Sequence, residues 1–293
     1  FHVRAKLGNA ARPRARVLLA ARMGKDVSMT VSVVIPAWGE TPFLSRAIDS
    51  VRNQTCADLE LIVAAPPETG PQTALAARLE GVRRAHGEWI LFIDADDWID
   101  RTLVEKLLAA ADSDAEVVVS GLVRGKRTVL FPTGDIWEAG PSDVFNCLCA
   151  RLFRKELFAG IGDMFDISLA YGEDLMAAAF LLYRAKKVVI LRQALYHYCD
   201  NMASMTHTLD GRQRVLDLMR VGEALRTLLP GEQFAAFHDR VTRDALLLWC
   251  RYCLWDRKIW RELRVRMTTP LLADRRHGLL KKGVLFCAHC FFD

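Results

Sequence analysis

The sequence predicts an α/β fold, built as a doubly wound, mostly parallel sheet with a C-terminal helical subdomain. Short β-branched runs alternate with amphipathic segments between residues 29 and 120, which is the pattern of strands joined by crossover helices. Several of these runs end in proline or aspartate, at the edge of the sheet where such folds bind ligands. Residues 211–265 instead carry apolar side chains at helical spacing, and these predict long helices.

The first strand and helix have the clearest signals. Residues 31–36 read Val-Ser-Val-Val-Ile-Pro, an apolar run typical of a parallel strand that is buried on both faces. Thr41 and Pro42 then fit the N-cap and the first position of a helix. The same alternation continues along the chain and predicts strands at 31–36, 59–63, 89–93 and 116–120, and helices at 41–51, 74–85 and 102–111.

Charge is divided unevenly along the chain. Residues 1–28 carry a net charge of +6 and residues 257–282 a net charge of +7, whereas residues 29–256 carry −7. A body with net negative charge is a poor nucleic-acid surface, so we expect no nucleic-acid partner. No apolar run reaches the roughly 18 to 20 residues that cross a bilayer, which argues against an integral membrane protein.

The first 28 residues differ in composition from the rest of the chain. They are rich in arginine and nearly free of acids, whereas Met29 directly precedes the first predicted strand. A transit peptide, a translated upstream stretch and an expression artefact all fit this pattern. We therefore expect residues 1–28 to be an extension outside the fold, residues 29–206 to form the α/β domain, and residues 207–293 to form a helical subdomain with a basic tail.

The sequence contains eight cysteines, several of them in apolar surroundings. In a chain of this length, free buried thiols in a reducing compartment are expected rather than a disulfide framework. Two Cys-x-x-Cys pairs, Cys250/Cys253 and Cys287/Cys290, raise the alternative of a zinc site. The 33 residues between them exceed the usual spacing of a zinc ribbon, so core packing is the preferred interpretation.

Three carboxylates follow the predicted strand at 89–93, namely Asp94, Asp96 and Asp97. So many acids in four residues repel one another unless a cation lies among them. A divalent ion bound here could keep positions open for water and a diphosphate. The alternative is that Asp97 or Asp100 caps the next helix, which accounts for one carboxylate but not for three.

Four segments resemble the motifs of the family 2 glycosyltransferases, in the order that the family has them. The resemblance extends over about residues 31–206 and is to the subgroup that builds bacterial capsule, exopolysaccharide or lipopolysaccharide. It implies a GT-A fold and an inverting, metal-dependent transfer of a sugar from a nucleotide-diphospho-sugar to a saccharide or lipid-linked acceptor. The four segments are Val31–Ala37, Ala47–Thr55, Ala85–Trp98 and Tyr171–Leu175.

The resemblance also implies roles for individual residues. Asp96 would bind Mn²⁺ or Mg²⁺, with Asp94 beside it or on the donor. Asp174 would be the general base and Glu173 would orient the acceptor, although an acidic start of a helix explains this pair equally well. The expected donor-binding residues are Pro36, Ala37, Glu40, Glu68, Arg78, Asp94 and Asp96.

One segment departs from the family pattern. An Asp-Asp turn normally follows the second strand and reads the nucleotide base, but residues 64–70 read Ala-Ala-Pro-Pro-Glu-Thr-Gly. Glu68 is the only acid there that could substitute, so the donor nucleotide stays open. This loss supports an alternative function as a non-catalytic, GT-A-like nucleotide- or partner-binding protein. Residues 37–40 read Ala-Trp-Gly-Glu and are not a Gly-rich phosphate loop, which argues against a nucleotidyltransferase.

Two further features have alternative interpretations. His197 lies between two tyrosines and is either a further metal ligand or a hydrogen-bonded residue near the core. Arg151, Arg154 and Lys155 either contact a phosphate or lie on a solvated helix face.

The basic tail, residues 257–293, interleaves basic and apolar side chains, with Trp260 as a candidate anchor. It either contacts an anionic membrane or packs its apolar stripe on the catalytic domain. The first alternative would suit an enzyme in the cytoplasm, at the inner face of the cell membrane.

Overall fold

The computed structural model describes residues 16–19, 31–39, 42–133, 136–137, 143–201, 208–252 and 256–266. Its helices are α1 (Leu44–Arg52), α2 (Ala74–Arg84), α3 (Leu103–Ala110), α4 (Glu173–Arg184), α6 (Gly211–Leu228), α7 (Gly231–Arg251) and α8 (Arg257–Arg266). Its strands are β1 (Arg16–Leu19), β2 (Val31–Pro36), β3 (Leu59–Ala64), β4 (Trp89–Phe92), β5 (Trp98–Ile99), β6 (Val117–Arg124), β7 (Arg127–Val129), β8 (Arg151–Arg154) and β9 (Lys187–Tyr198).

These strands form one sheet in the order β1-β9-β6-β8-β4-β2-β3, with β5 paired to β9 and β7 to β6. The pairs β2–β3, β2–β4, β6–β9 and β1–β9 are parallel, whereas β8 runs antiparallel to both β4 and β6. The predicted doubly wound and mostly parallel sheet is therefore confirmed. The carboxyl ends of β2, β3 and β4 lie at one edge of this sheet.

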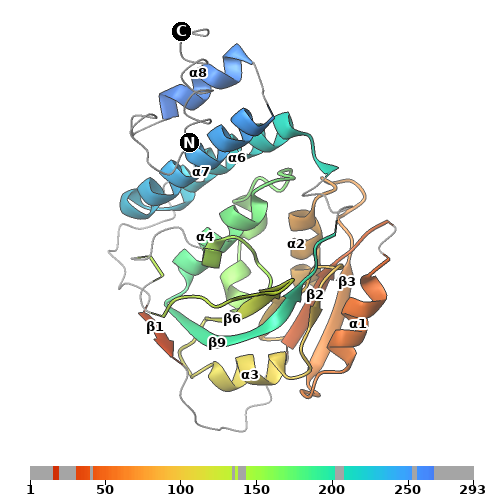
Figure 1. Cartoon of the computed structure of the whole chain (residues 1–293). Coiled ribbons are helices and arrows are strands. Elements are labelled where there is room, and N and C mark those ends of the chain that lie inside the picture. The colour runs from red at the N-terminus through yellow and green to blue at the C-terminus, as the bar shows by residue number, and fades with distance from the viewer. Residues whose placement is uncertain are drawn as a thin grey trace.

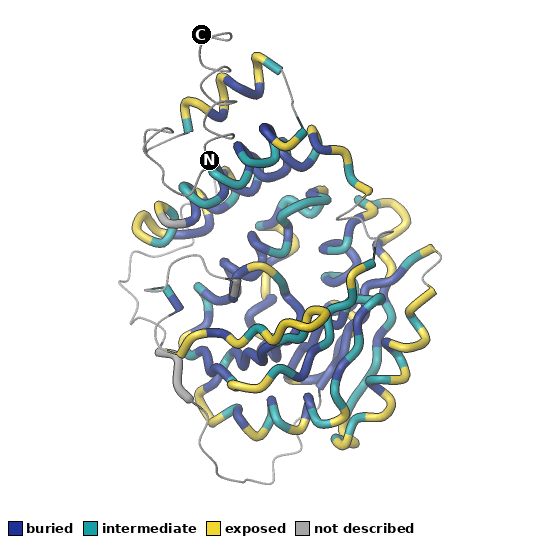
Figure 2. Tube along the Cα trace, in the orientation of Figure 1, coloured by how far each residue is buried: buried dark blue, intermediate teal, exposed yellow. Residues whose placement is uncertain are grey.

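Helices cover both faces of the sheet (Figure 1). One buried cluster joins alternate side chains of β2 and β4 to α1 and α3, and a second joins the other face to α2 and α4. Side chains alternate between the two faces of a strand, so a central strand covered on both faces is apolar throughout. Figure 2 shows the result, with buried strands at the centre and exposed residues along the outer helices.

Close packing between α2 and β2 depends on a glycine. A Cβ atom added at Gly81 would lie 2.2 Å from Cγ1 of Val34, which is closer than two non-bonded carbon atoms can approach. The absence of a side chain lets α2 approach the sheet, and this helix carries Arg78 toward the end of β4.

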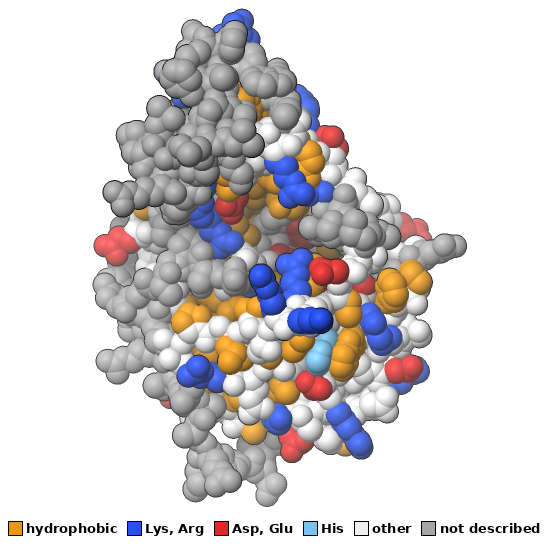
Figure 3. Space-filling model, viewed as in Figure 1, with side chains coloured by type: hydrophobic (Ala, Val, Ile, Leu, Met, Phe, Trp, Pro, Cys, Tyr) orange, Lys and Arg blue, Asp and Glu red, His pale blue; other side chains and the backbone are white. Residues whose placement is uncertain are grey.

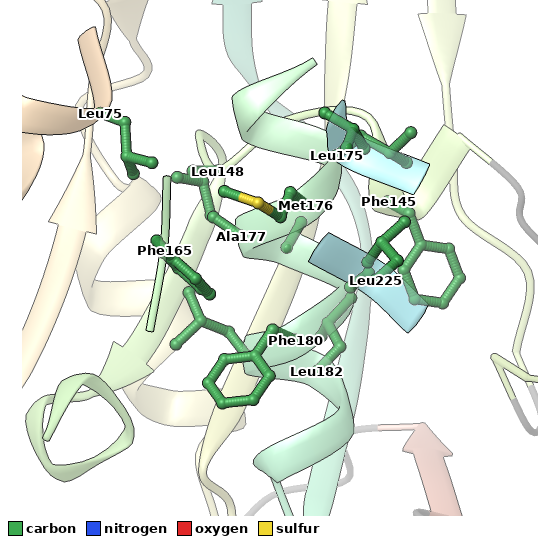
Figure 4. Close-up of a cluster of buried hydrophobic side chains, with 14 of the residues drawn as sticks. Leu75, Phe145, Leu148, Phe165, Leu175, Met176, Ala177, Phe180, Leu182 and Leu225 are labelled. Carbon is green, nitrogen blue, oxygen red and sulfur yellow. The ribbon is translucent and has the colours of Figure 1, made fainter. Parts of the chain in front are cut away.

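The C-terminal helices share the core of the α/β domain. Leu225 of α6 packs with Leu175, Phe180 and Leu182 of α4 in the larger buried cluster (Figure 4). Trp260 of α8 is buried and its ring centroid lies 5.1 Å from that of Trp249 on α7. Trp260 is therefore not an exposed membrane anchor, and the apolar stripe of α8 packs against the helical subdomain. No described helix is both long enough and apolar enough to span a bilayer.

Most of the predicted elements are confirmed, with boundaries that coincide or shift by up to four residues. The strands predicted at 31–36, 59–63, 89–93 and 116–120 are β2, β3, β4 and β6, and the helices predicted at 74–85, 102–111 and 211–265 are α2, α3 and α6 to α8. Helix α1 begins at Leu44, after a turn at Pro42 and Phe43, so Pro42 is not its first helical residue. Thr41, the predicted N-cap, lies outside the described residues.

Two predictions about the sheet are wrong. Residues 16–19 form β1 and pair with β9, so this part of the N-terminal extension belongs to the sheet. Arg151 lies on β8 and is 0% exposed, so it is not on a solvated helix face. Both errors concern segments whose pairing partner, β6 or β9, is distant in the sequence.

Candidate active site

Arg78 connects two of the predicted site segments. Its guanidinium lies at hydrogen-bond distance from Asp94, at the end of β4, and from Asp174, in the first turn of α4, with both contacts 2.7 Å long. Glu173 lies further away, with 3.9 Å between its Oε1 and Nη1 of Arg78. The Arg78 side chain is only 5% exposed, and the three carboxylates raise its pKa although burial opposes them. Arg78 is therefore a charged clamp between the acidic turn and α4.

The start of α2 is held against the loop that precedes α4. Thr73 caps α2 by accepting a hydrogen bond from the backbone N–H of Ala76, and its hydroxyl donates to the backbone oxygen of Ile167. An N-cap of this kind is worth about 1 kcal/mol to a helix. It also sets the position of α2, and so of Arg78, relative to α4.

The acidic pair of α4 is positioned from the helical subdomain. Asp217 on α6 is fully buried and accepts hydrogen bonds from the backbone N–H groups of Ala170 and Tyr171. Gly172 follows with φ of 78°, a conformation that favours glycine, and α4 then begins at Glu173. The helical subdomain thus fixes the entry into α4.

Glu173 and Asp174 differ in their protonation. Burial and the charge of Asp174 raise the pKa of Glu173 to about 8, although Arg78 opposes them. Burial also raises the pKa of Asp174, but Arg78 opposes this at the shorter distance of 2.7 Å. Because a cation favours ionisation of the carboxylate closest to it, the geometry assigns the proton of this pair to Glu173 rather than to Asp174. The predicted alternative, an acidic helix start, is also realised, since both residues lie in the first turn of α4.

The three acids of the turn after β4 are stabilised in three different ways. Asp94 is paired with Arg78, as described above. Asp97 is fully buried, and its carboxylate accepts hydrogen bonds from the Tyr196 hydroxyl and the Cys199 backbone N–H. Burial and the charge of Asp94 raise the pKa of Asp97 to about 8, so this group is mostly neutral at pH 7. Asp97 is thus a structural residue, and its predicted role as a helix cap is wrong.

Asp96 is the acid of this turn that suits a metal ion. Its carboxylate accepts a hydrogen bond from the side-chain amide of Asn201, which is a neutral group. Burial raises the pKa of Asp96 and the neighbouring Asp94 raises it further, although the Asn201 hydrogen bond and the charge of Arg46 oppose them, so a bound cation would stabilise the ionised form. Arg46 donates to the backbone oxygen of Asp96 and holds the turn from α1. A hard divalent ion with oxygen ligands fits this environment.

The described residues do not by themselves form a complete metal site. No group of three or more His, Cys, Asp or Glu side chains in the described part of the chain could hold an ion by itself. An ion bound at this turn would therefore need water and substrate phosphates in addition to one or two carboxylates.

His197 lies on β9, opposite β5. Its ring stacks on Trp98, with 3.5 Å between the ring centroids and 6° between the planes, and its Nε2 lies 3.2 Å from Oδ2 of Asp100. These contacts match the second interpretation of this residue, a hydrogen-bonded position near the core. The Asp100 contact engages Nε2, which a metal ion would have to displace or avoid. A ligand role for His197 stays a prediction.

The remaining donor-site predictions lie around the ends of β2 and β3. Pro36 and Ala37 are buried at the end of β2, where the backbone N–H of Ala37 donates to the carbonyl of Ala64 on β3. Glu68 is exposed in the turn after β3, and Glu40 lies outside the described residues. On the face seen in Figure 3, charged side chains of both signs surround a hollow between the helical part and the sheet.

Comparison with known proteins supports the predicted resemblance. The family model described as glycosyl transferase family 2 matches residues 71–164. EpsJ of Bacillus subtilis, named an uncharacterized glycosyltransferase, is 24% identical over 215 residues, which are 60% of this chain and 62% of that protein. The poly(ribitol-phosphate) beta-glucosyltransferase of Bacillus spizizenii is 22% identical over 58% of this chain and 32% of its own length. The chain therefore spans less than two thirds of the curated relatives that it matches.

Solved structures show the same fold. TarS residues 1–349 from S. aureus superpose with a TM-score of 0.56 at 14% identity, over 81% of this chain and 82% of that one. The mannosyltransferase PcManGT from Pyrobaculum calidifontis superposes with a TM-score of 0.51 at 13% identity, over 96% of this chain and 89% of that one. The sheet order and these neighbours show that the chain has the GT-A fold, and its residues 71–164 match the model of the family 2 glycosyltransferases.

Proposed function

We propose that this protein is an inverting, metal-dependent glycosyltransferase of surface-polysaccharide assembly. It would move a sugar from a nucleotide-diphospho-sugar to a saccharide or lipid-linked acceptor. The observation that carries the proposal is the Arg78 clamp, which brings Asp174 of α4 into one site with the acidic turn after β4. Such a site offers a carboxylate for the donor side and another for the acceptor side of a displacement.

Asp96, with Asp94 beside it, would hold the metal ion. Mn²⁺ or Mg²⁺ bound there would offset the charge that develops on the leaving nucleoside diphosphate. Arg46 and Asn201 hold the backbone and the side chain of Asp96, so the direction of its carboxylate is set before any ligand arrives. Arg78 meanwhile neutralises Asp94, which reduces the repulsion between the two carboxylates.

Asp174 would take the proton of the acceptor hydroxyl. Its Oδ1 accepts from Arg78, so we assign the proton transfer to Oδ2. A single base that faces a single displacement implies inversion at the anomeric carbon. Glu173, protonated at neutral pH, would contribute a hydrogen-bond donor toward the acceptor instead of a second negative charge.

Related proteins support a nucleotide-sugar donor and a surface polymer as acceptor. Structures of TarS hold UDP and UDP-GlcNAc, and that of PcManGT holds GDP-Man and Mn²⁺. Curated relatives include the poly(ribitol-phosphate) beta-glucosyltransferase and the minor teichoic acid biosynthesis protein GgaB. The TarS and PcManGT structures hold different nucleotides, and the 64–70 turn of this chain lacks the Asp-Asp pair. We therefore propose the donor class without choosing the nucleotide base.

The test is a donor panel. UDP-, GDP-, CDP- and TDP-sugars are incubated with the protein and Mn²⁺ or Mg²⁺, and release of the nucleoside diphosphate is measured with and without acceptor sugars. We expect turnover with one nucleotide class, loss of turnover on chelation, and an inverted anomeric configuration in the product by NMR. Turnover that survives chelation would contradict the metal dependence, and a retained configuration would contradict the single-displacement mechanism.

A second candidate is a GT-A-like protein that binds a nucleotide or a partner without catalysis. The observation that favours it is the 64–70 turn, in which Glu68 is the only acid and is exposed. Thermal-shift measurements with Mn²⁺ and each nucleoside diphosphate separate the two functions. Stabilisation by a nucleotide without turnover of any donor in the panel would favour this candidate.

We place the enzyme in the cytoplasm, at the inner face of the membrane. The support is the basic outer face of α8, where Arg257, Lys258, Arg261 and Arg264 are exposed while Ile259, Trp260 and Leu263 are buried. Such a face can contact anionic lipid by charge without inserting apolar side chains.

A further inference from the structure

Two cysteines lie in the segment that leads into β8, next to the acidic turn. Cys149 is buried, and its backbone forms a bridge with Phe92, the last residue of β4. Ala150 follows with φ of 58°, an uncommon angle for a residue other than glycine. Cys147 is partly exposed. The charges of Asp174 and Asp94 act on the Cys147 thiol, so this sulfur lies within electrostatic reach of the active site.

Arg151, on β8, is a buried cation beside these cysteines. It is 0% exposed, and no carboxylate of the described residues lies within ion-pair distance of it. Its guanidinium donates to the backbone oxygens of Val144 and Cys149 and, over 3.4 Å, to Sγ of Cys147. Of these three acceptors, two are neutral carbonyls and only the sulfur can become negative. Asp174 interacts with this charge only at longer range. A buried cation without a counter-charge in contact is costly, so this arrangement favours ionised sulfur.

The protonated and ionised forms of Cys147 make different contacts. A thiol would donate to the backbone oxygen of Cys149 over 3.7 Å, which is a weak hydrogen bond. A thiolate would accept a charge-assisted bond from Arg151 over 3.4 Å, which is the stronger interaction. A hydrogen bond from the Cys149 side chain and the charge of Arg151 lower the pKa of Cys147 to about 7, although burial and the charges of Asp174 and Asp94 oppose them.

We propose that Cys147 is a thiolate held by Arg151 and that it is a site of covalent modification by disulfides and soft carbon electrophiles. With a disulfide reagent, the sulfur of Cys147 attacks one sulfur of the reagent and the reagent's S–S bond breaks. A mixed disulfide forms on Cys147, and the other half of the reagent leaves as a thiolate. Cys149 is buried and stays protonated, because Cys147 and burial raise its pKa. The proposal does not depend on the glycosyltransferase activity.

The test measures the reaction of the full chain with the chromogenic disulfide dithiobis(nitrobenzoate) as a function of pH. We expect one fast-reacting thiol whose rate levels off near pH 7, whereas an ordinary cysteine levels off at about pH 8.5. Arg151→Met should move this point upward, toward about pH 8.5, and Arg151→Lys, which keeps the charge, should restore part of the shift. At pH 6 the fast phase should slow by up to about fivefold in Arg151→Met, because the loss of thiolate is partly offset by a more nucleophilic sulfur.

Matched cysteine variants identify the reacting thiol. Cys147→Ser should abolish the fast phase, whereas Cys56→Ser and Cys199→Ser, which also change partly exposed cysteines, should leave it intact. Mass-spectrometric mapping of the first label in the unsubstituted protein tests the same point even where Arg151→Met fails to fold. A fast phase that persists in Cys147→Ser, a first label on another cysteine, or a rate that levels off near pH 8.5 in the unsubstituted protein would overturn the proposal.

Discussion

Nη1 of Arg78 lies 2.7 Å from Oδ1 of Asp174, so the carboxylate to which we assign the proton transfer is held by a buried cation. This contact has two effects. It fixes the position of the base relative to the acidic turn, because the same guanidinium binds Asp94. It also keeps Asp174 ionised while Glu173, which is further from the charge, holds a proton.

Removal of the Arg78 charge should therefore damage both the fold and the activity. Arg78→Met leaves the partly buried carboxylates of Asp94 and Asp174 without their cation, and breaking a buried ion pair in this way costs about 3–5 kcal/mol. We expect a clear fall in the free energy of unfolding, measured in urea, together with loss of turnover. Arg83→Met on the exposed side of α2 is the matched control, and its stability should change by less than about 1 kcal/mol. Equal stabilities of the two variants would contradict the clamp.

Asp174→Asn tests the assigned base without removing the hydrogen-bond acceptor of Arg78. If Asp174 takes the acceptor proton, kcat should fall by about 10²- to 10⁴-fold with donor affinity nearly unchanged. The measurement combines steady-state kinetics with donor titration by calorimetry. A comparable fall in donor affinity would instead place Asp174 in the donor site.

Asp96→Asn tests the metal ligand. The substitution keeps the size of the side chain and its contact with Asn201 but removes the charge that a divalent ion needs. We expect Mn²⁺-dependent binding of the nucleoside diphosphate to be lost while the thermal unfolding temperature without metal stays the same or rises. Asp49→Asn, an exposed acid on α1, is the control and should bind as the unsubstituted chain does. Undiminished Mn²⁺-dependent binding by Asp96→Asn would exclude this role.

The sequence indicated which residues lie together better than it indicated their protonation and partners. Asp94 could be selected because it follows a strand at the ligand-binding edge of the sheet, whereas Arg78 and Asp174 were selected through the family resemblance. The structure brings these three side chains into contact. The burial of Asp97 depends on Tyr196, which reaches it from β9, and no local pattern in the sequence encodes that pairing. Strand β8 was missed for a related reason.

Strand β8 is four residues long, and an arginine lies at each end, so its composition predicts a polar surface. Its position between β4 and β6 buries Arg151 nevertheless. Neighbours supplied by long-range pairing therefore decide the state of a charged residue here, and a single sequence does not contain them.

The pKa of Glu60 predicts how the free energy of unfolding changes as the pH falls. Burial raises the pKa of this β3 carboxyl, but hydrogen bonds from Ser32, His86 and Gly87 outweigh burial and lower it from 4.5 to about 2. A depressed folded-state pKa means that the unfolded chain binds the proton more readily. The stabilisation is therefore complete above about pH 4.5 and is lost as the pH falls toward 2.

Glu60→Gln should lower the free energy of unfolding at pH 6 and weaken its dependence on pH between about 5 and 3. Urea unfolding at a series of pH values measures both effects. Glu156→Gln, which changes an exposed acid, is the control and should keep the original dependence. Identical pH profiles for Glu60→Gln and the unsubstituted chain would contradict the inferred hydrogen-bond effect.

The basic face of α8 predicts an electrostatic mode of membrane contact. Arg257, Lys258, Arg261 and Arg264 are exposed, while Trp260 is buried against Trp249 and cannot insert into lipid. Each basic residue close to an anionic surface contributes about 1 kcal/mol, and salt screens this attraction within a Debye length of about 8–10 Å. We therefore expect the protein to sediment with phosphatidylglycerol vesicles at low salt and to be released as salt rises, with no binding to phosphatidylcholine.

Reversal of two charges, Lys258→Glu together with Arg261→Glu, should weaken this sedimentation strongly, because both substitutions lie on the exposed face and leave the buried stripe of α8 unchanged. The control, Arg52→Glu together with Arg83→Glu, changes the net charge of the protein by the same amount, but on the exposed faces of α1 and α2. It should retain most of the binding. If both double variants lose binding equally, the attraction comes from net charge and not from α8. Binding that withstands high salt would show instead that apolar side chains insert, and the position of Trp260 in the core would then have to change on the membrane.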